Sequence, residues 1–253
     1  MSKEIHRSDV DKPNWHDVIY QAFKIGADCA DKSVSNCIPF PLASFIYNFA
    51  FTDPAVKRRD DWMESLDNRI SELKLRIDDI EQRIIESDNA MSALFCISSL
   101  VLNTTSSIKL SAFQNIIINA SLYPEYEEYK IQMFLSIIND FTEWHLIVLK
   151  YLADPKKALK EKGIEYNPNE ELFCNSFRPF YLLYPEMKKE ENLLSVIIDD
   201  LFNKGLSQCN KDFLHSQYLP SDPTKASHPF YNYTTELGNE LLKFINLPKD
   251  EKP

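Results

Sequence analysis

The chain has 253 residues, only 4 of them glycine, and a formal net charge of −10. With 44% hydrophobic and 26% charged residues, it has the composition of a globular protein that can bury a core. Its glycines, Gly26, Gly163, Gly205 and Gly238, stand too far apart for a Rossmann loop, a P-loop or a nucleophile elbow. Enzymes that depend on such glycine-rich loops are therefore excluded.

Charge and cysteine content bear on partners and compartment. An acidic chain is repelled on average by nucleic acid and by anionic membranes, and neither half of the chain, divided at Asp140, is basic. The five cysteines are odd in number and include no Cys-x-x-Cys pair, and the first residues are polar, unlike a signal peptide. We therefore expect unpaired thiols in a reducing cytoplasm.

The N-terminal part contains two stretches without charged side chains. Asn14 can cap a first helix over about residues 15–32, which is followed by the charge-free residues 33–52. A second charge-free stretch covers residues 89–108. Buried helices are the simpler interpretation of both. For residues 38–51, however, basic residues follow at 57–59, so a peripheral membrane effector that uses this segment remains an alternative.

A heptad pattern lies between these stretches and predicts one long helix over 54–86, with Asp53 as its cap. Its apolar positions alternate in steps of three and four residues, which defines an a/d seam: Met63, Leu66, Ile70, Leu73, Ile77, Ile80 and Ile84. The seam is a candidate interface for self-association, and a parallel two-stranded coiled coil is permitted.

The residues beside the seam leave its partner open. In a parallel dimer, Arg69 would face Lys74 of the second copy, which is repulsive, whereas Arg76 would face Glu81, which is attractive. Glu72 and Arg76 also form a favourable i,i+4 pair within one helix. A homodimer and an intramolecular helical hairpin both remain possible.

Two further amphipathic helices are expected over about 107–122 and 125–139, with Pro124 breaking the chain between them. These elements predict a helical N-terminal domain over residues 1–140.

The C-terminal part, residues 141–253, contains three more helical patterns. Residues 141–155 form a helix with Thr142 as N-cap, and residues 191–208 form a helix that ends at Gly205-Leu206. Residues 231–245 read as a short β-like piece followed by a helix that Thr234 or Thr235 caps. The order of these elements resembles a winged-helix domain of the multiple-antibiotic-resistance type of regulator. The resemblance rests on the motifs Leu201-x-x-x-Gly205-Leu206 and Thr235-Glu236-Leu237-Gly238.

That resemblance implies a mainly α fold, with a helical N-terminal domain followed by a winged-helix-like α(+β) module. The chain departs from the pattern in a loop-rich insertion over 155–187 and in a long stretch, 207–233, where the β-wing belongs. The helix in the recognition position, 188–204, carries Glu190 and Glu191 near its start, where DNA-reading helices present basic or amide side chains. A DNA-binding regulator remains an alternative, and its phosphate contacts would be Lys188, Lys189, Lys204, Lys211 and Lys225.

The chain as a whole also resembles uncharacterised bacterial helical proteins from mobile or phage-defence islands. The matching pieces are Ile38-Pro39, the stretch Arg58-Arg59-Asp60-Asp61-Trp62, and Trp144-His145-Leu146. The resemblance implies a bacterial setting and no particular activity.

No enzymatic pattern emerges from the remaining polar residues. His145 and Glu143 stand two positions apart on a helix and point to different faces, and the spacing of Cys209, His215 and His228 matches no zinc site. The aromatic residues near 173–184 are expected in the core or at an interface. We therefore expect no catalytic, cofactor-binding or metal-binding residues. The sequence favours a non-enzymatic protein that acts through protein contacts or self-association, through the seam and the segment 173–184.

Overall fold

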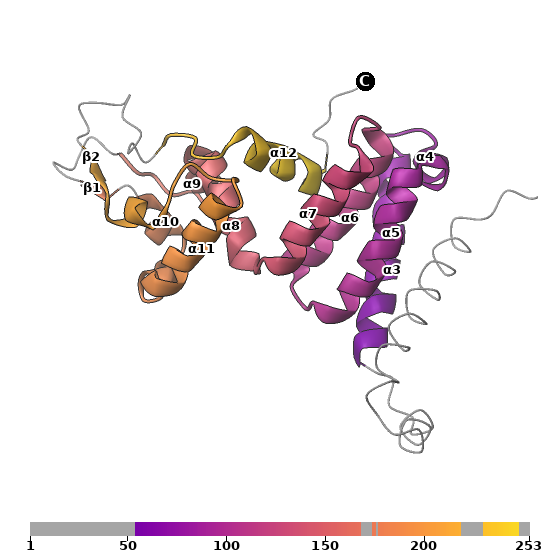
Figure 1. Ribbon diagram of the computed structural model, residues 1–253, viewed down its shortest axis with the longest axis horizontal. Helices are drawn as coiled ribbons and strands as arrows, with labels where there is room; N and C mark the ends of the chain where they lie inside the picture. The colour runs from indigo at the N-terminus through magenta and orange to yellow at the C-terminus, as the bar shows by residue number, and fades with distance from the viewer. Residues whose placement is uncertain (1–53, 168–173, 176, 219–229, 248–253) are drawn as a thin grey trace, which may run out of the picture. The chain divides into compact units, whose positions relative to one another are not determined.

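The computed structural model describes residues 54–167, 174–175, 177–218 and 230–247 (Figure 1). The chain divides into two compact units, Met1–Leu135 and Ser136–Pro253, here called unit 1 and unit 2. The division falls inside helix α7 (Glu128–Asp140), whereas the sequence placed the boundary at its end. The expected helix at 15–32 and the apolar segment 38–51 lie outside the described residues.

Unit 1 is helical in its described part. Two serines cap its helices: the Ser87 hydroxyl accepts a hydrogen bond from the Ala90 N–H at 3.2 Å, and the Ser106 hydroxyl accepts one from the Lys109 N–H at 3.4 Å. The described elements of unit 1 are the start of α7 and the following helices: α3 (Pro54–Lys74), α4 (Ile80–Glu86), α5 (Asp88–Leu100), the short 3₁₀-helix η1 (Val101–Asn103) and α6 (Ser107–Leu122).

The expected continuous helix over 54–86 is wrong, because the chain turns between α3 and α4. Asp79 lies in the left-handed region, with φ 57°, a conformation that aspartate tolerates better than most residues. The turn brings Lys74, at the end of α3, into an ion pair with Glu81 in α4. In one straight helix these side chains would stand about 10 Å apart along the axis. The turn thus folds the last part of the seam back onto unit 1.

The seam lies inside unit 1. Its side chains at Leu66, Ile70, Leu73, Ile80 and Ile84 are at most 4% exposed, and only Met63 and Ile77 are partly exposed. A side chain that is buried within its own unit leaves no surface for a second copy. Of the two arrangements that the sequence left open, the intramolecular one is therefore the one seen in this fold.

Helix α6 is the centre of unit 1, because every residue from Ala112 to Ala120 is buried. The sequence predicted an amphipathic helix here. Its bounds, 107–122, are correct, but the helix is buried on all sides over residues 112–120 and is not amphipathic. The polar Gln114 is satisfied from α3: its amide donates to the Ser65 hydroxyl at 3.1 Å and its oxygen accepts from Arg69 at 3.1 Å. Arg69 therefore reaches α6 of its own unit.

The described part of unit 1 includes no single helix that is long and apolar enough to cross a membrane. One bent pair, Ile80–Glu86 with Asp88–Asn103, meets the length and composition requirement, with an angle of 84° between its parts.

Unit 2 is built around α8 (Glu143–Ala153), which packs against α9, α11 and α12. The predicted loop-rich insertion over 155–187 is wrong in part, because it contains three short helical turns. Following α8, the elements are α9 (Pro155–Glu161), the strand β1 (Cys174–Asn175), α10 (Arg178–Leu183), η3 (Pro185–Lys188), α11 (Glu191–Asn203), η4 (Lys211–His215), the strand β2 (Gln217–Tyr218) and α12 (Glu236–Ile245).

The β structure of unit 2 is small. Strands β1 and β2, two residues each, pair antiparallel, and an isolated bridge joins Ser207 to Thr234. The wing of a winged helix was expected over 207–233, of which residues 219–229 lie outside the described residues. The mainly α character is confirmed, and the described residues do not show a β-wing.

The two motifs behind the winged-helix resemblance meet in space. Helix α11 ends in a Schellman motif, with Gly205 at φ 71° and the Leu206 N–H bonded to the Leu201 carbonyl at 2.9 Å. The Thr235 hydroxyl caps α12 by accepting from the Gly238 N–H at 3.0 Å, and it donates to the Gly205 carbonyl at 2.6 Å. The predicted glycine end and threonine cap are thus confirmed, and together they join the end of α11 to the start of α12.

Candidate functional site

Helix α11 stands where the resemblance puts a recognition helix. Its buried residues, Leu194, Ile197, Ile198 and Leu201, follow helical spacing and face the interior of unit 2, where α11 packs against α8. Three large apolar side chains of the helix are exposed: Leu193 at 44%, Val196 at 56% and Phe202 at 45%. At about 3.6 residues per turn, Leu193 and Phe202 lie on opposite flanks of the helix, and Val196 lies between them on its outer side. We call these three residues the outer face of α11.

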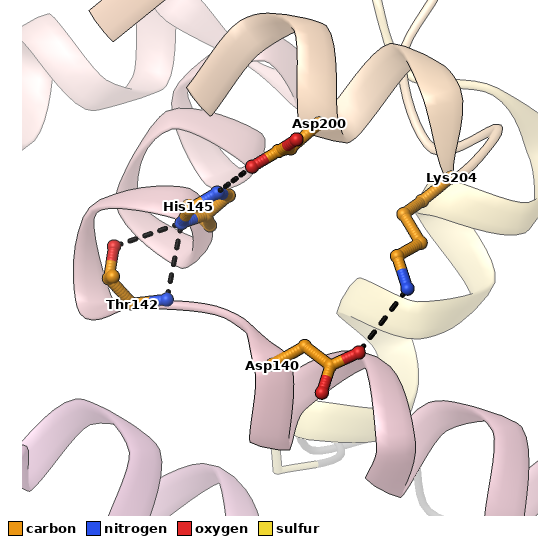
Figure 2. Close-up of polar contacts among 5 residues, drawn as sticks. All are labelled: Asp140, Thr142, His145, Asp200 and Lys204. Atoms are coloured by element: carbon orange, nitrogen blue, oxygen red, sulfur yellow. Dashed lines mark hydrogen bonds and ion pairs between the residues drawn. The ribbon is translucent and has the colours of Figure 1, made fainter. Parts of the chain in front are cut away.

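A polar anchor fastens α11 to the start of α8 (Figure 2). The Nε2 atom of His145 lies 3.2 Å from the Asp200 carboxylate, and the Nδ1 atom lies 3.2 Å from the backbone nitrogen of Thr142. Near this contact, Lys204 forms an ion pair with Asp140 at 3.3 Å. The polar anchor consists of the five residues that Figure 2 labels: Asp140, Thr142, His145, Asp200 and Lys204.

The hydrogen bonds of His145 define which ring nitrogen carries the proton. A backbone N–H can only donate, so Nδ1, which accepts from Thr142, has no proton in the neutral ring. The proton is then on Nε2, which donates to Asp200. The ring is 6% exposed and stacks on Phe141 with 4.5 Å between the ring centres. His145 is therefore held on two edges and one face.

The order Thr142, His145, Asp200 looks like a hydrolase triad, but its geometry is that of a helix cap. The Thr142 hydroxyl lies 2.9 Å from Nδ1, yet the backbone N–H of the same residue points at the one lone pair of that nitrogen. A histidine at the third position of a helix that returns to the N-cap residue plays the part that Glu or Gln has in a capping box.

The lysines proposed as phosphate contacts are differently placed. Lys204 pairs with Asp140, and Lys211 lies 3.6 Å from Asp199, whereas Lys188 and Lys189 are exposed beside Glu190. Lys225 lies outside the described residues. Two of the five cations are thus already matched by a carboxylate of their own unit, and the helix that would enter DNA carries three acidic residues. Such a surface attracts phosphate weakly.

The aromatic segment near 173–184 contributes mainly to the core. Phe177 and Phe180 are fully buried and lie against Tyr151 of α8, with ring centres 5.5 and 5.0 Å apart. Of its described residues, Leu182 is the large apolar side chain that stays exposed, at 41%. Of the two places expected for these aromatic residues, the core is therefore the one seen for Phe177 and Phe180, which fill the space between α8 and α10.

Burial lowers the chemical reactivity of another group in unit 2, the Cys209 thiol. Burial raises the pKa of the Cys209 thiol to about 12, so this thiol is not a nucleophile at neutral pH. Within the described residues, no group of three or more histidine, cysteine or acidic side chains is arranged to hold a metal ion.

Alkaline pH is expected to unfold unit 2 through its tyrosines. Burial raises the pKa of Tyr151 well above its ordinary value of 10.0, and burial also raises those of Tyr233 and, to about 12, of Tyr181. Because the unfolded chain releases these protons near pH 10, stability is complete below that pH and falls as the pH rises above it. The fully buried Tyr151 contributes up to about 1.4 kcal/mol per pH unit between its two pKa values, and the partly exposed Tyr181 contributes less.

The measurement is a denaturant titration followed by circular dichroism at several pH values between about 8 and 12. Tyr151→Phe keeps the ring packing and should make the decline above pH 10 shallower. Exposed Tyr129, in α7, is the matched control, and Tyr129→Phe should leave the decline unchanged. An equal effect of both variants would contradict the assignment to buried tyrosines.

Comparisons with known proteins do not extend this description: no family of known proteins, no curated protein and no solved structure matches the chain.

The sequence predicted the role of one of the five residues of the polar anchor. Thr142 was predicted as the N-cap of α8, and its spacing from His145 is that of a capping box, a signal that was available in the sequence. Asp200 stands 55 residues further along the chain, and nothing local connects it to His145. The outer face of α11 was also missed, because this helix was interpreted only as a possible DNA recognition helix.

Proposed function

We propose that this chain is a non-enzymatic protein that acts through contact with another protein, and that the outer face of α11 is its contact surface. In line with the whole-chain resemblance, its setting is the bacterial cytoplasm, in regulation or phage defence. The observation that carries the proposal is the exposure of Leu193, Val196 and Phe202 on one helix of 13 residues.

Scattered exposed apolar residues are normal on protein surfaces, but three of them on one short helix support a docking role. They are on a helix that is held from behind by four buried side chains and from the side by the polar anchor. A rigid helix loses little conformational entropy when it binds, so its exposed side chains contribute more of their burial to affinity. Asn192 and Asn203 flank them with uncharged amides that can form hydrogen bonds at the rim.

Charge favours a protein partner over DNA. Glu190, Glu191 and Asp199 are on or next to α11 and repel phosphate, and the nearby Lys204 and Lys211 are paired with carboxylates. A protein surface with an apolar groove has no such conflict with the outer face.

Site-specific photo-crosslinking tests the proposal. A photo-reactive residue at position 196 should give a discrete adduct with one partner in the native host, and the double variant Leu193→Ser with Phe202→Ser should abolish it. Exposed Glu236, at the start of α12, provides the control position and should give no such adduct. Equal labelling from both positions, or none from position 196, would reject the outer face as the contact surface.

The DNA-binding alternative has its own measurement. Titration of a fluorescent mixed-sequence duplex with the protein at low salt should show no binding. Binding that weakens steeply with added salt would instead support the regulator and make Lys188 and Lys189 the residues to replace.

A further inference from the structure

We infer that His145 makes the start of α8 a proton-sensitive contact, in which one proton exchanges the partner of Nδ1 from the Thr142 backbone to the Thr142 hydroxyl. The inference goes beyond the proposed function and does not depend on it, because its readouts are the His145 ring and the Thr142 amide. It rests on the geometry of a buried histidine whose two nitrogens have different kinds of partner (Figure 2).

The second proton of the ring has only one place to go. In the neutral ring the proton is on Nε2, so the lone pair of Nδ1 is the basic site, and this is where the Thr142 N–H points. Once Nδ1 carries a proton, two donors face each other at 3.2 Å, and the backbone N–H loses its acceptor. The reciprocal bond of the capping box, from the Thr142 N–H to His145, therefore cannot survive protonation.

The protonated ring nevertheless keeps an acceptor on each side. The Thr142 hydroxyl oxygen, 2.9 Å from Nδ1, can accept the new N–H, and the Asp200 carboxylate continues to accept from Nε2 and is attracted by the positive charge. The two states thus differ in one hydrogen bond at the start of α8. The ring can change between them without leaving its site against Phe141.

Other charged groups around the ring act in both directions. Two carboxylates favour the protonated ring: Asp200, on α11, and Glu143, in the first turn of α8. The positive end of the α8 dipole opposes protonation. Lys204 also opposes it, but its charge is matched by Asp140. The helices α9 and α12, which pack against α8 as well, carry both signs of charge: Lys156, Lys157, Lys160 and Glu161 on α9, and Glu236, Glu240 and Lys243 on α12.

The consequence reaches α11. The His145–Asp200 contact connects the first turn of α8 to the helix that carries Leu193, Val196 and Phe202. When the bond from the Thr142 N–H to Nδ1 is lost, only the other half of the capping box remains, so the first turn of α8 is the least protected part of this contact. The polar anchor is thereby a regulatory element: acidification loosens the start of α8 beneath α11.

Nuclear magnetic resonance of the full chain tests each step. At about pH 7.5, ring nitrogen shifts should show Nδ1 unprotonated and Nε2 protonated, and both should move together as the pH falls to about 5. Over the same range, exchange of the Thr142 amide, corrected for its intrinsic pH dependence, should become at least about tenfold faster, which corresponds to about 1.4 kcal/mol.

Two variants separate the proton effect from simple loss of structure. His145→Gln keeps an amide oxygen that can accept from the Thr142 N–H, so its Thr142 amide should be protected at every pH in the range. Asp200→Asn removes the negative charge but keeps an acceptor, so the change should move to lower pH. A proton on Nδ1 at neutral pH, a ring that does not titrate above about pH 5, or the same pH dependence in His145→Gln would each overturn the inference.

Discussion

Ile70→Lys is expected to unfold unit 1 while leaving unit 2 folded. Ile70 is fully buried in the middle of α3, in the seam that faces the interior of unit 1. An ammonium group at this position would be taken out of water, and such a change costs at least about 4 kcal/mol. That is a large part of the stability of a small domain. Circular dichroism at 222 nm during thermal unfolding should show an early loss of part of the helical signal.

Ile77→Lys is the matched control, because it introduces the same charge in the same seam. Ile77 lies in the turn between α3 and α4 and is partly exposed, so its lysine can reach water and the cost should be about 1 kcal/mol or less. If the seam instead joined two copies of the chain, both variants would halve the mass measured by light scattering. A halved mass with unchanged thermal stability would contradict the intramolecular seam.

The seam shows what the sequence can and cannot predict here. Apolar spacing identified seven seam residues, of which five are buried and two, Met63 and Ile77, are partly exposed. The spacing carried no information about the turn at residues 75–79, because seam positions keep their periodicity on both sides of it. Tertiary packing decides the turn. Burying Ile80 and Ile84 in unit 1 contributes more free energy than the further helical turns that α3 would form by continuing into solvent.

The burial of helix α6 and the partner of His145 could not be predicted for a related reason. The polar residues Gln114 and Asn119 made α6 look amphipathic, although both are buried, because a buried amide is tolerated when other elements satisfy it, as Ser65 and Arg69 do for Gln114. His145 likewise found its partner, Asp200, far along the chain. Local pattern predicts which residues start a helix, but it does not predict which distant side chain completes a hydrogen bond.

Gly238→Ala is expected to detach α12 from the end of α11. A Cβ at position 238 would stand 2.1 Å from the Leu206 carbonyl oxygen, a backbone atom that cannot rotate away. The same oxygen accepts a hydrogen bond from the Thr235 N–H at 3.1 Å, so a shift that relieves the overlap also breaks the cap region of α12. Overpacking against a fixed backbone atom costs about 3 kcal/mol, at the upper end of the usual range. Urea unfolding of unit 2 should show this loss as a lower midpoint.

Gly205→Ala distinguishes steric overlap from loss of glycine flexibility. Gly205 has φ 71°, and an added Cβ there would meet nothing within 4 Å, so the cost is the conformational one of about 1 kcal/mol. Asparagine, which tolerates this conformation, should cost less at position 205. At position 238 the helical backbone suits any residue, so alanine would be neutral or slightly stabilising if the close approach of Leu206 were absent. The ratio of the two losses in stability therefore measures how closely the Leu201-x-x-x-Gly205-Leu206 motif packs against the Thr235-Glu236-Leu237-Gly238 motif.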